Sequence, residues 1–167
     1  MSGCLCTRGL DEVALIVSNG ADAITAAAAM VYPTAAHQLC LAHWFRLLED
    51  LTPALDAARR RKFRREFWWL WEAEDESQWR RWAANFCRPW QFWAPPMVEK
   101  FQAELDRVLA CLCWPARWRH RLRTTNLAEG LLRHLRRYLG RFPGCVDPAQ
   151  SEHVLSCFIL ACEQAHA

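Results

Sequence analysis

The chain has 167 residues, enough for one domain with a sizeable core, and 53% of them are hydrophobic while 23% are charged. This balance excludes a disordered chain, and no apolar run approaches the roughly 20 residues that a membrane-spanning helix requires. The formal net charge of +3 is too small to indicate a partner. We see no charged leader before an apolar core, so the sequence predicts a cytoplasmic protein without a secretion signal. The nine cysteines are scattered and odd in number, which favours reduced core residues over a disulfide scaffold.

The first 52 residues alternate between strand and helix patterns. The apolar run Ala14 to Val17 ends at Ser18-Asn19-Gly20, which predicts a buried strand followed by a tight turn. The alanine-rich residues 21–30 favour a helix, residues 36–41 a second short strand, and residues 42–51 a second helix. This order is expected of an α/β core whose site lies at the strand ends.

From residue 53 to about residue 112 the pattern is helical only. We expect a basic helix over residues 59–71 that ends in an aromatic cluster. A second helix is marked by aromatic residues that recur on one face, Trp79, Trp82 and Phe86. The proline-rich residues 89–96 predict a break before a third helix with an apolar stripe over residues 98–112. The spacing of the tryptophans favours core packing over a platform on which bases stack.

The C-terminal part begins with a polar, basic stretch. Thr124 or Thr125 can cap a helix that we expect over residues 126–139, with Gly140 as its stop. A final helix is predicted for residues 148–164.

The helix predicted for residues 126–139 divides into an apolar and a polar side at about 100° per residue. Its polar side gathers one carboxylate, one amide and several arginines: Asn126, Glu129, Arg133, Arg136 and Arg137. By itself, Glu129 with arginines at i+4 and i+7 favours a surface ion pair, which stabilises a helix by roughly a few tenths of a kcal/mol. The flanking residues change this interpretation.

Three segments, in order, resemble motifs of Mutator-type DDE transposases. Residues 15–20 are similar to the strand end that carries the family's middle aspartate, and residues 32–43 to the next segment with its Cys-x-x-His signature. Residues 118–129 are similar to the motif in which a Thr-Asn pair precedes the last acidic residue, here Glu129. The arginine-rich residues 131–137 match the helix that continues beyond it.

The resemblance implies an α/β, mostly helical fold with a truncated RNase H-like core. That core occupies residues 1–52, an all-helical insertion occupies residues 53–114, and core helices with the last acidic residue occupy residues 115–167. It also implies metal-dependent hydrolysis of a DNA phosphodiester followed by strand transfer. Two magnesium ions would stabilise the attacking and leaving oxygens, and Glu129 is the carboxylate expected to bind them.

The same resemblance implies the functional residues and the partners. Catalytic positions fall on Glu129, Asn19, His43 and Cys40. Contacts to the DNA backbone fall on the basic stretch and the helix after it: Arg119, Arg121, Arg123, Asn126, Arg133, Arg136 and Arg137. The expected partners are transposon-end and target DNA, with a second copy of the chain or an intact transposase as further possibilities.

Two positions depart from the family pattern. Asn19 stands where the middle aspartate is expected, and its neutral carbonyl oxygen is a poorer magnesium ligand than a carboxylate. Asp22, one turn further on, is a poor substitute because a helix residue points differently from a strand-end ligand. Gly130 stands where the family usually has arginine. We also expect the chain to begin too late to include the family's first aspartate, and we therefore predict that it cannot cut or join DNA alone.

Three other interpretations are open. Cys40 and His43, with His37 nearby, resemble half of a zinc site, but a structural zinc takes four ligands and packing near the strand ends is favoured. A non-catalytic DNA-binding or interaction module would use the basic face from Arg117 to Arg141. In the third interpretation the chain is a helical domain whose arginines form only a solvated face.

Overall fold

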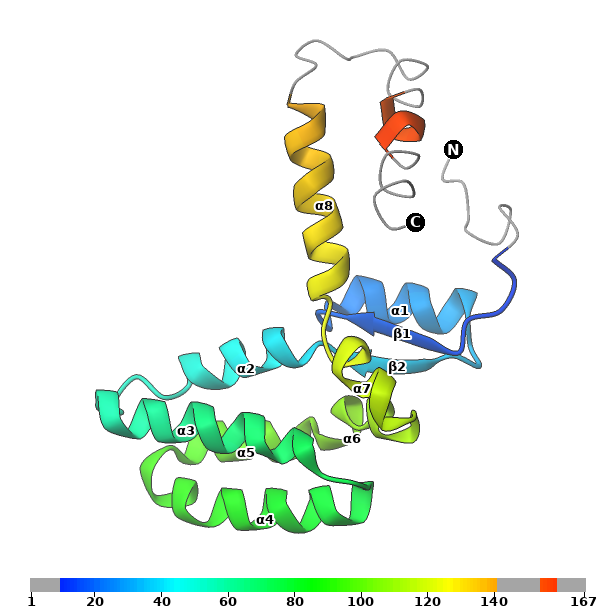
Figure 1. Cartoon of the computed structure of the whole chain (residues 1–167). Coiled ribbons are helices and arrows are strands. Elements are labelled where there is room, and N and C mark those ends of the chain that lie inside the picture. The colour runs from blue at the N-terminus through cyan, green and yellow to red at the C-terminus, as the bar shows by residue number, and fades with distance from the viewer. Residues whose placement is uncertain (1–9, 141–153, 159–167) are drawn as a thin grey trace. The chain divides into compact units, whose positions relative to one another are not determined.

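The computed structural model describes residues 10–140 and 154–158, and the chain forms two compact units, residues 1–125 and 126–167. The first unit contains a two-stranded sheet and the helices α1 to α7, and the second contains α8 (Figure 1). Within the described residues, no helix combines the length and the apolar character of a membrane span. The fold is therefore α/β and mostly helical, as predicted.

The sheet consists of two parallel strands joined by a helix. Strand β1 (Leu15–Ser18) pairs with β2 (Ala36–Leu39), and α1 (Asp22–Val31) connects them. The register places Leu15 opposite Ala36 and Ser18 opposite Leu39. Pairing continues by one residue, because the Cys40 N–H donates to the Ser18 carbonyl at 2.7 Å. Parallel strands end at the same edge of a sheet, so the residues after β1 and β2 lie side by side.

Helices make up the rest of the first unit. They are α2 (Leu41–Asp50), α3 (Ala57–Trp69), α4 (Glu76–Trp93), α5 (Pro95–Ala103), α6 (Leu105–Val108) and α7 (Ala116–Leu122), with short 3₁₀ turns η2 (Leu70–Glu72) and η3 (Ala110–Cys113). Two of them begin at an aspartate cap: Asp56 accepts from the Arg59 N–H at 2.8 Å, and Asp75 accepts from the Gln78 N–H at 2.7 Å. The prediction of a helical segment after the sheet is confirmed.

Aromatic side chains from four helices form the core of this unit. The Trp44 ring stacks on Phe101 at 4.9 Å between centroids and contacts Phe67 at 5.5 Å. The Phe63 ring meets the edge of Trp90 at 5.5 Å, which joins α3 to α4. All five side chains are almost completely buried. For the buried tryptophans the packing interpretation is confirmed.

The break predicted at the proline-rich residues 89–96 begins in the wrong place. Pro89 lies inside α4, which continues to Trp93. Proline has no N–H, so the Asn85 carbonyl one turn earlier loses its helical donor. Both residues are exposed, and water can therefore satisfy that carbonyl. The chain turns at Ala94 instead, and Pro95 begins α5, where a missing N–H costs nothing.

The third helix predicted for this segment is also interrupted. In place of one helix over residues 98–112, the chain forms α5, the single turn α6 and the 3₁₀ turn η3. The buried Gln38 side chain from β2 supplies hydrogen bonds to the backbone at the interruption, at Val108 and Cys111. A tertiary contact thus replaces the helical hydrogen bonds that the apolar pattern predicted.

The second unit contains α8 (Asn126–Leu139), in agreement with the predicted helix. The Gly140 N–H donates to the Arg136 carbonyl at 3.0 Å, and the helix ends there as expected. The Tyr138 ring contacts Phe158 at 5.5 Å, and residues 154–158 are helical. The rest of the helix predicted for residues 148–164 lies outside the described residues.

Candidate functional site at the strand ends

The turn after β1 holds the first predicted site residue. The Asn19 side chain is exposed, and its Oδ1 accepts a hydrogen bond from the Ala21 N–H at 3.1 Å. The Ser18 Oγ accepts from the Gly20 N–H at 3.1 Å and lies 2.7 Å from His37 Nε2. The Asn19 oxygen therefore closes the turn before α1, which is a usual role for asparagine after a strand.

Gly20 is the residue on which this turn depends. Its φ of 82° lies in the left-handed region, where side chains are unfavourable. A Cβ there would come within 2.4 Å of Leu39 Cδ1 and 3.5 Å of Arg107 Nη2. The turn thus brings the Gly20 backbone against the Leu39 side chain of β2 and beside the Arg107 guanidinium of α6.

Gln38 ties the strand ends to the helices behind them. Its side chain is fully buried. The Nε2 group donates to the Leu39 carbonyl at 2.8 Å and the Val108 carbonyl at 2.9 Å, and the Oε1 atom accepts from the Cys111 N–H at 2.8 Å. A buried amide with its hydrogen bonds satisfied in this way fixes the position of β2.

Cys40 attaches the segment before α8 to the end of β2. Its buried Sγ accepts from both the N–H and the hydroxyl of Thr125, each at 3.3 Å, and the adjacent Leu41 N–H donates to the Arg123 carbonyl at 2.9 Å. Burial acts to raise the pKa of the Cys40 thiol, but hydrogen bonds from Thr125 and His43 outweigh it and lower the pKa below its ordinary value. The catalytic role expected for Cys40 and His43 stays a prediction.

His37 lies on β2, next to Ser18 at the end of β1. Partial burial and the positive charge of Arg107 lower its pKa, so the imidazole is neutral at neutral pH. A neutral imidazole can serve the hydrogen bond to Ser18 Oγ.

The predicted DNA-binding arginines of the first unit have different surroundings. Arg119 donates to three backbone carbonyls, those of Trp114 at 2.8 Å, Ala73 at 3.2 Å and Glu74 at 2.7 Å. Arg123 lies 3.8 Å from a Glu72 carboxylate oxygen. Arg121 is exposed. Arg119 therefore has a structural role in addition to its predicted one.

The remaining predicted residues lie on α8, in the second unit. They are Asn126, Glu129, Arg133, Arg136 and Arg137. The proximity of Glu129 to Asn19 stays a prediction, because the two residues belong to separate units.

The residues described at the strand ends do not fit a magnesium ion. Among the residues that the structure describes, no three cysteine, histidine, aspartate or glutamate side chains are grouped so that they could hold a metal. The donors beside Asn19 are an amide, a thiol and imidazoles, whereas magnesium prefers carboxylate oxygens.

Sequence comparison places this site in a known family. The family model "Transposase, Mutator family" matches residues 3–146. The chain belongs to the Mutator family of transposases. The matched residues include both strand ends and the whole of α8, so the resemblance noted in the sequence is confirmed at the level of the family.

Two transposases similar to this chain show how much of their length the chain covers. The transposase for insertion sequence element IST2 of Acidithiobacillus ferrooxidans is 28% identical over 142 residues, which are 84% of this chain and 47% of that protein. The transposase for insertion sequence element ISRM5 of Rhizobium meliloti (strain 1021) is 28% identical over 130 residues, which are 78% of this chain and 32% of that protein. The chain therefore spans less than half the length of these relatives.

The structure also reveals site residues that the sequence analysis missed. Gln38, Arg107 and Thr125 all contact the strand ends. Thr125 belongs to the predicted Thr-Asn pair and is a possible helix cap, and Gln38 lies within the matched residues 32–43, but no pattern predicts the contacts of these residues or of Arg107, because each contact joins residues far apart along the chain.

Proposed function

We propose that the chain is a part of an insertion-sequence transposase that binds DNA and cannot cut or join it alone. The parallel β1-α1-β2 unit, with Asn19 directly after β1 and the Cys40-x-x-His43 segment directly after β2, supports an RNase H-like core. In this proposal the helical residues 53–114 form an insertion, and Glu129 provides the last acidic position. The partners are transposon-end and target DNA, together with a second copy of the chain or an intact transposase.

The observation that carries this proposal is the amide at position 19. An acidic residue there would offer a charged oxygen to a metal, whereas Asn19 is neutral and its oxygen already accepts from Ala21 N–H. Metal-dependent hydrolysis of a phosphodiester requires carboxylates that offset the charge of the cations. The described strand-end residues lack such a set, so we derive no catalytic step at this site.

A strand-transfer assay tests the proposal directly. The purified chain is incubated with magnesium or manganese and with DNA that carries transposon ends, and nicked and joined products are resolved on a gel. We expect no product from the wild-type chain. Products from the wild-type chain, absent from a Glu129→Gln control, would contradict the proposal.

A non-catalytic DNA-binding function is the second candidate, and the Asn19 amide favours it too. The basic residues on α7 and α8 can bind phosphates without any metal. Duplex binding that weakens with salt, without cleavage, is the result that this function predicts. No duplex binding at low salt would leave neither function standing.

A further inference from the structure

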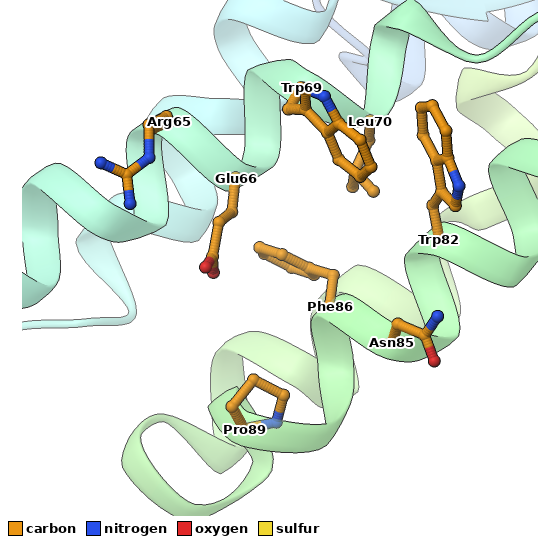
Figure 2. A pocket seen from close by; sticks show the side chains of 8 residues that line it. All are labelled: Arg65, Glu66, Trp69, Leu70, Trp82, Asn85, Phe86 and Pro89. Carbon is orange, nitrogen blue, oxygen red and sulfur yellow. The ribbon is translucent and has the colours of Figure 1, made fainter.

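A pocket opens between α3 and α4, away from the strand ends (Figure 2). Its volume is ≈ 480 Å³, within the range of small-ligand sites. Three lining residues come from α3, namely Arg65, Glu66 and Trp69, and four come from α4, namely Trp82, Asn85, Phe86 and Pro89. Figure 2 shows Glu66 and Phe86 pointing toward one another across the pocket, with the two indoles at one end.

The two indoles form a stack at the edge of the core. The centroids of the Trp69 and Trp82 rings lie 3.9 Å apart at an interplanar angle of 17°. Trp82 is partly buried and packs against the core, whereas Trp69 is 54% exposed. An indole usually buries its large apolar surface, so core packing explains Trp82 and leaves the exposed face of Trp69 beside the pocket unexplained.

Positive charge lies next to this stack. Lys62 and Arg64 pair with Glu66 and Glu49, whereas Arg65 is exposed and forms no ion pair within the described part of the chain. Its guanidinium is thus available to an anionic ligand. A phosphate is well suited, since arginine binds it with paired hydrogen bonds.

Basic and aromatic side chains also line a smaller cavity next to the pocket, and we call the two cavities together the α3–α4 groove. The smaller cavity has a volume of ≈ 70 Å³, shares Pro89 with the main pocket and is lined by Arg59, Lys62 and Trp93. The Arg59 guanidinium lies 3.8 Å from the centroid of the Trp93 ring. From Arg59 to Trp69 the helix rises about 15 Å, so the groove can follow more than one nucleotide.

We propose that this α3–α4 groove binds unpaired nucleotides of a single DNA strand, with a base stacked at Trp69 and Trp82 and a phosphate at Arg65. Aromatic platforms beside basic residues are how proteins hold single strands, because every base presents a flat face. The bases of a duplex are already stacked on one another and cannot enter the pocket. The choice of DNA as the ligand rests on the proposed function.

Glu66 is compatible with such a ligand although it is acidic. One of its oxygens accepts from the Trp90 Nε1–H at 3.0 Å, and Lys62 lies 3.7 Å from the other. These contacts offset its charge, and a carboxylate can accept hydrogen bonds from the amino group of a base. Asn85 lines the same pocket and has both donor and acceptor groups.

The experiment compares binding of one labelled oligonucleotide as a single strand and as a duplex. Fluorescence anisotropy is measured with the full wild-type chain and with Trp69→Ala, Trp69→Phe, Arg65→Gln and Arg64→Gln. We expect Trp69→Ala to weaken single-strand binding about tenfold and to leave duplex binding unchanged. Trp69→Phe keeps an aromatic face and most of the affinity. Arg65→Gln weakens single-strand binding, whereas Arg64→Gln, which makes the same change of charge on the other side of α3, has little effect.

The outcomes separate this inference from the proposed function. Single-strand binding that is equal in the wild type and Trp69→Ala overturns the inference, and so does a parallel loss of duplex binding in that variant. A chain that binds duplex but no single strand contradicts the inference alone. A chain that binds neither contradicts both, and the groove would then suit a protein partner. Thermal unfolding of each variant shows that the comparison is made on folded protein.

Discussion

The Gln38 side chain joins β2 to α6 and η3. It hydrogen-bonds within β2 and to the backbone at the end of α6 and in η3, all in the protein interior. Asn19, two strand positions away, is exposed and bonds only to its own turn. The buried Gln38 amide therefore holds the strand end in place, whereas the exposed Asn19 amide occupies the position predicted to be functional.

The substitution Gln38→Met tests the structural importance of the buried amide. Methionine is similar in size but leaves the buried Cys111 N–H without the Gln38 acceptor, at a cost of about 1–3 kcal/mol. It also removes one donor from the Val108 carbonyl, which still accepts from Cys111 Sγ at 3.8 Å. We expect the free energy of unfolding to fall by about 2–4 kcal/mol, measured by urea denaturation. Gln102→Met is the control, because Gln102 is exposed on α5. This substitution should change the free energy of unfolding by less than about 0.5 kcal/mol. Equal stability of the two variants would contradict the role assigned to Gln38.

The elements around the strand ends are joined by side chains rather than by continuous secondary structure. Two strands supply the edge, and α6 contributes Arg107 beside Gly20. The segment after α7 is attached through the Cys40–Thr125 contact. The helix predicted over residues 98–112 is interrupted after α5 for the same reason. The interruption leaves backbone groups of Val108 and Cys111 to hydrogen-bond with the Gln38 side chain.

Thr125→Val tests the connection between β2 and the segment before α8. The variant loses the hydroxyl that donates to Cys40 Sγ, so the Cys40 pKa rises and stability falls by about 0.5–1.5 kcal/mol. In the wild type the folded pKa of Cys40 lies below its ordinary value, so the unfolded chain binds more protons and this contribution to stability grows as pH rises toward 9.0. The deficit of Thr125→Val is therefore expected to be larger at about pH 9.5 than at about pH 7.

Chemical denaturation at the two pH values measures this difference. The neighbouring Thr124→Val provides the control, since it removes a similar hydroxyl that does not contact Cys40. A deficit that is independent of pH would show that Thr125 does not act through the Cys40 thiol.

At the scale of the whole molecule, the chain combines a small sheet with a helical layer built on aromatic residues (Figure 1). The second unit adds a helix with one carboxylate among arginines. The two relatives of the chain are transposases more than twice as long as the segments that match it. In the functions proposed above, the basic helix binds the phosphates of a duplex and the α3–α4 groove binds unpaired bases.

The basic face of α8 is tested by replacing Arg133, Arg136 and Arg137 together with glutamine. Each phosphate contact releases about 0.9 counterion, so we expect the slope of log K against log salt to fall by up to about 3 in magnitude. Duplex binding measured by anisotropy over a range of salt concentrations gives this slope. A triple substitution at exposed arginines of the first unit, Arg61, Arg81 and Arg88, is the control. An unchanged slope in the α8 variant would place the duplex elsewhere.

Local patterns were sufficient for the family and for most of the elements. The apolar run before Asn19 predicted β1 within one residue, and the polar face around Glu129 predicted the bounds of α8. Local patterns failed at Pro89, where an exposed carbonyl allows a helix to continue, and at the apolar stripe that Gln38 interrupts. Both the continuation of α4 through Pro89 and the interruption after α5 depend on solvent exposure or on contacts with residues far away along the chain.

The sequence by itself determined the order of strands and helices, the family and the neutral amide at position 19, because each follows from residues close together along the chain. Only the tertiary structure decided that Thr125 meets Cys40, that Arg107 faces Gly20, and which tryptophans are left exposed beside a pocket. These facts depend on which helix faces cover one another, and helical periodicity marks an apolar face without specifying its partner.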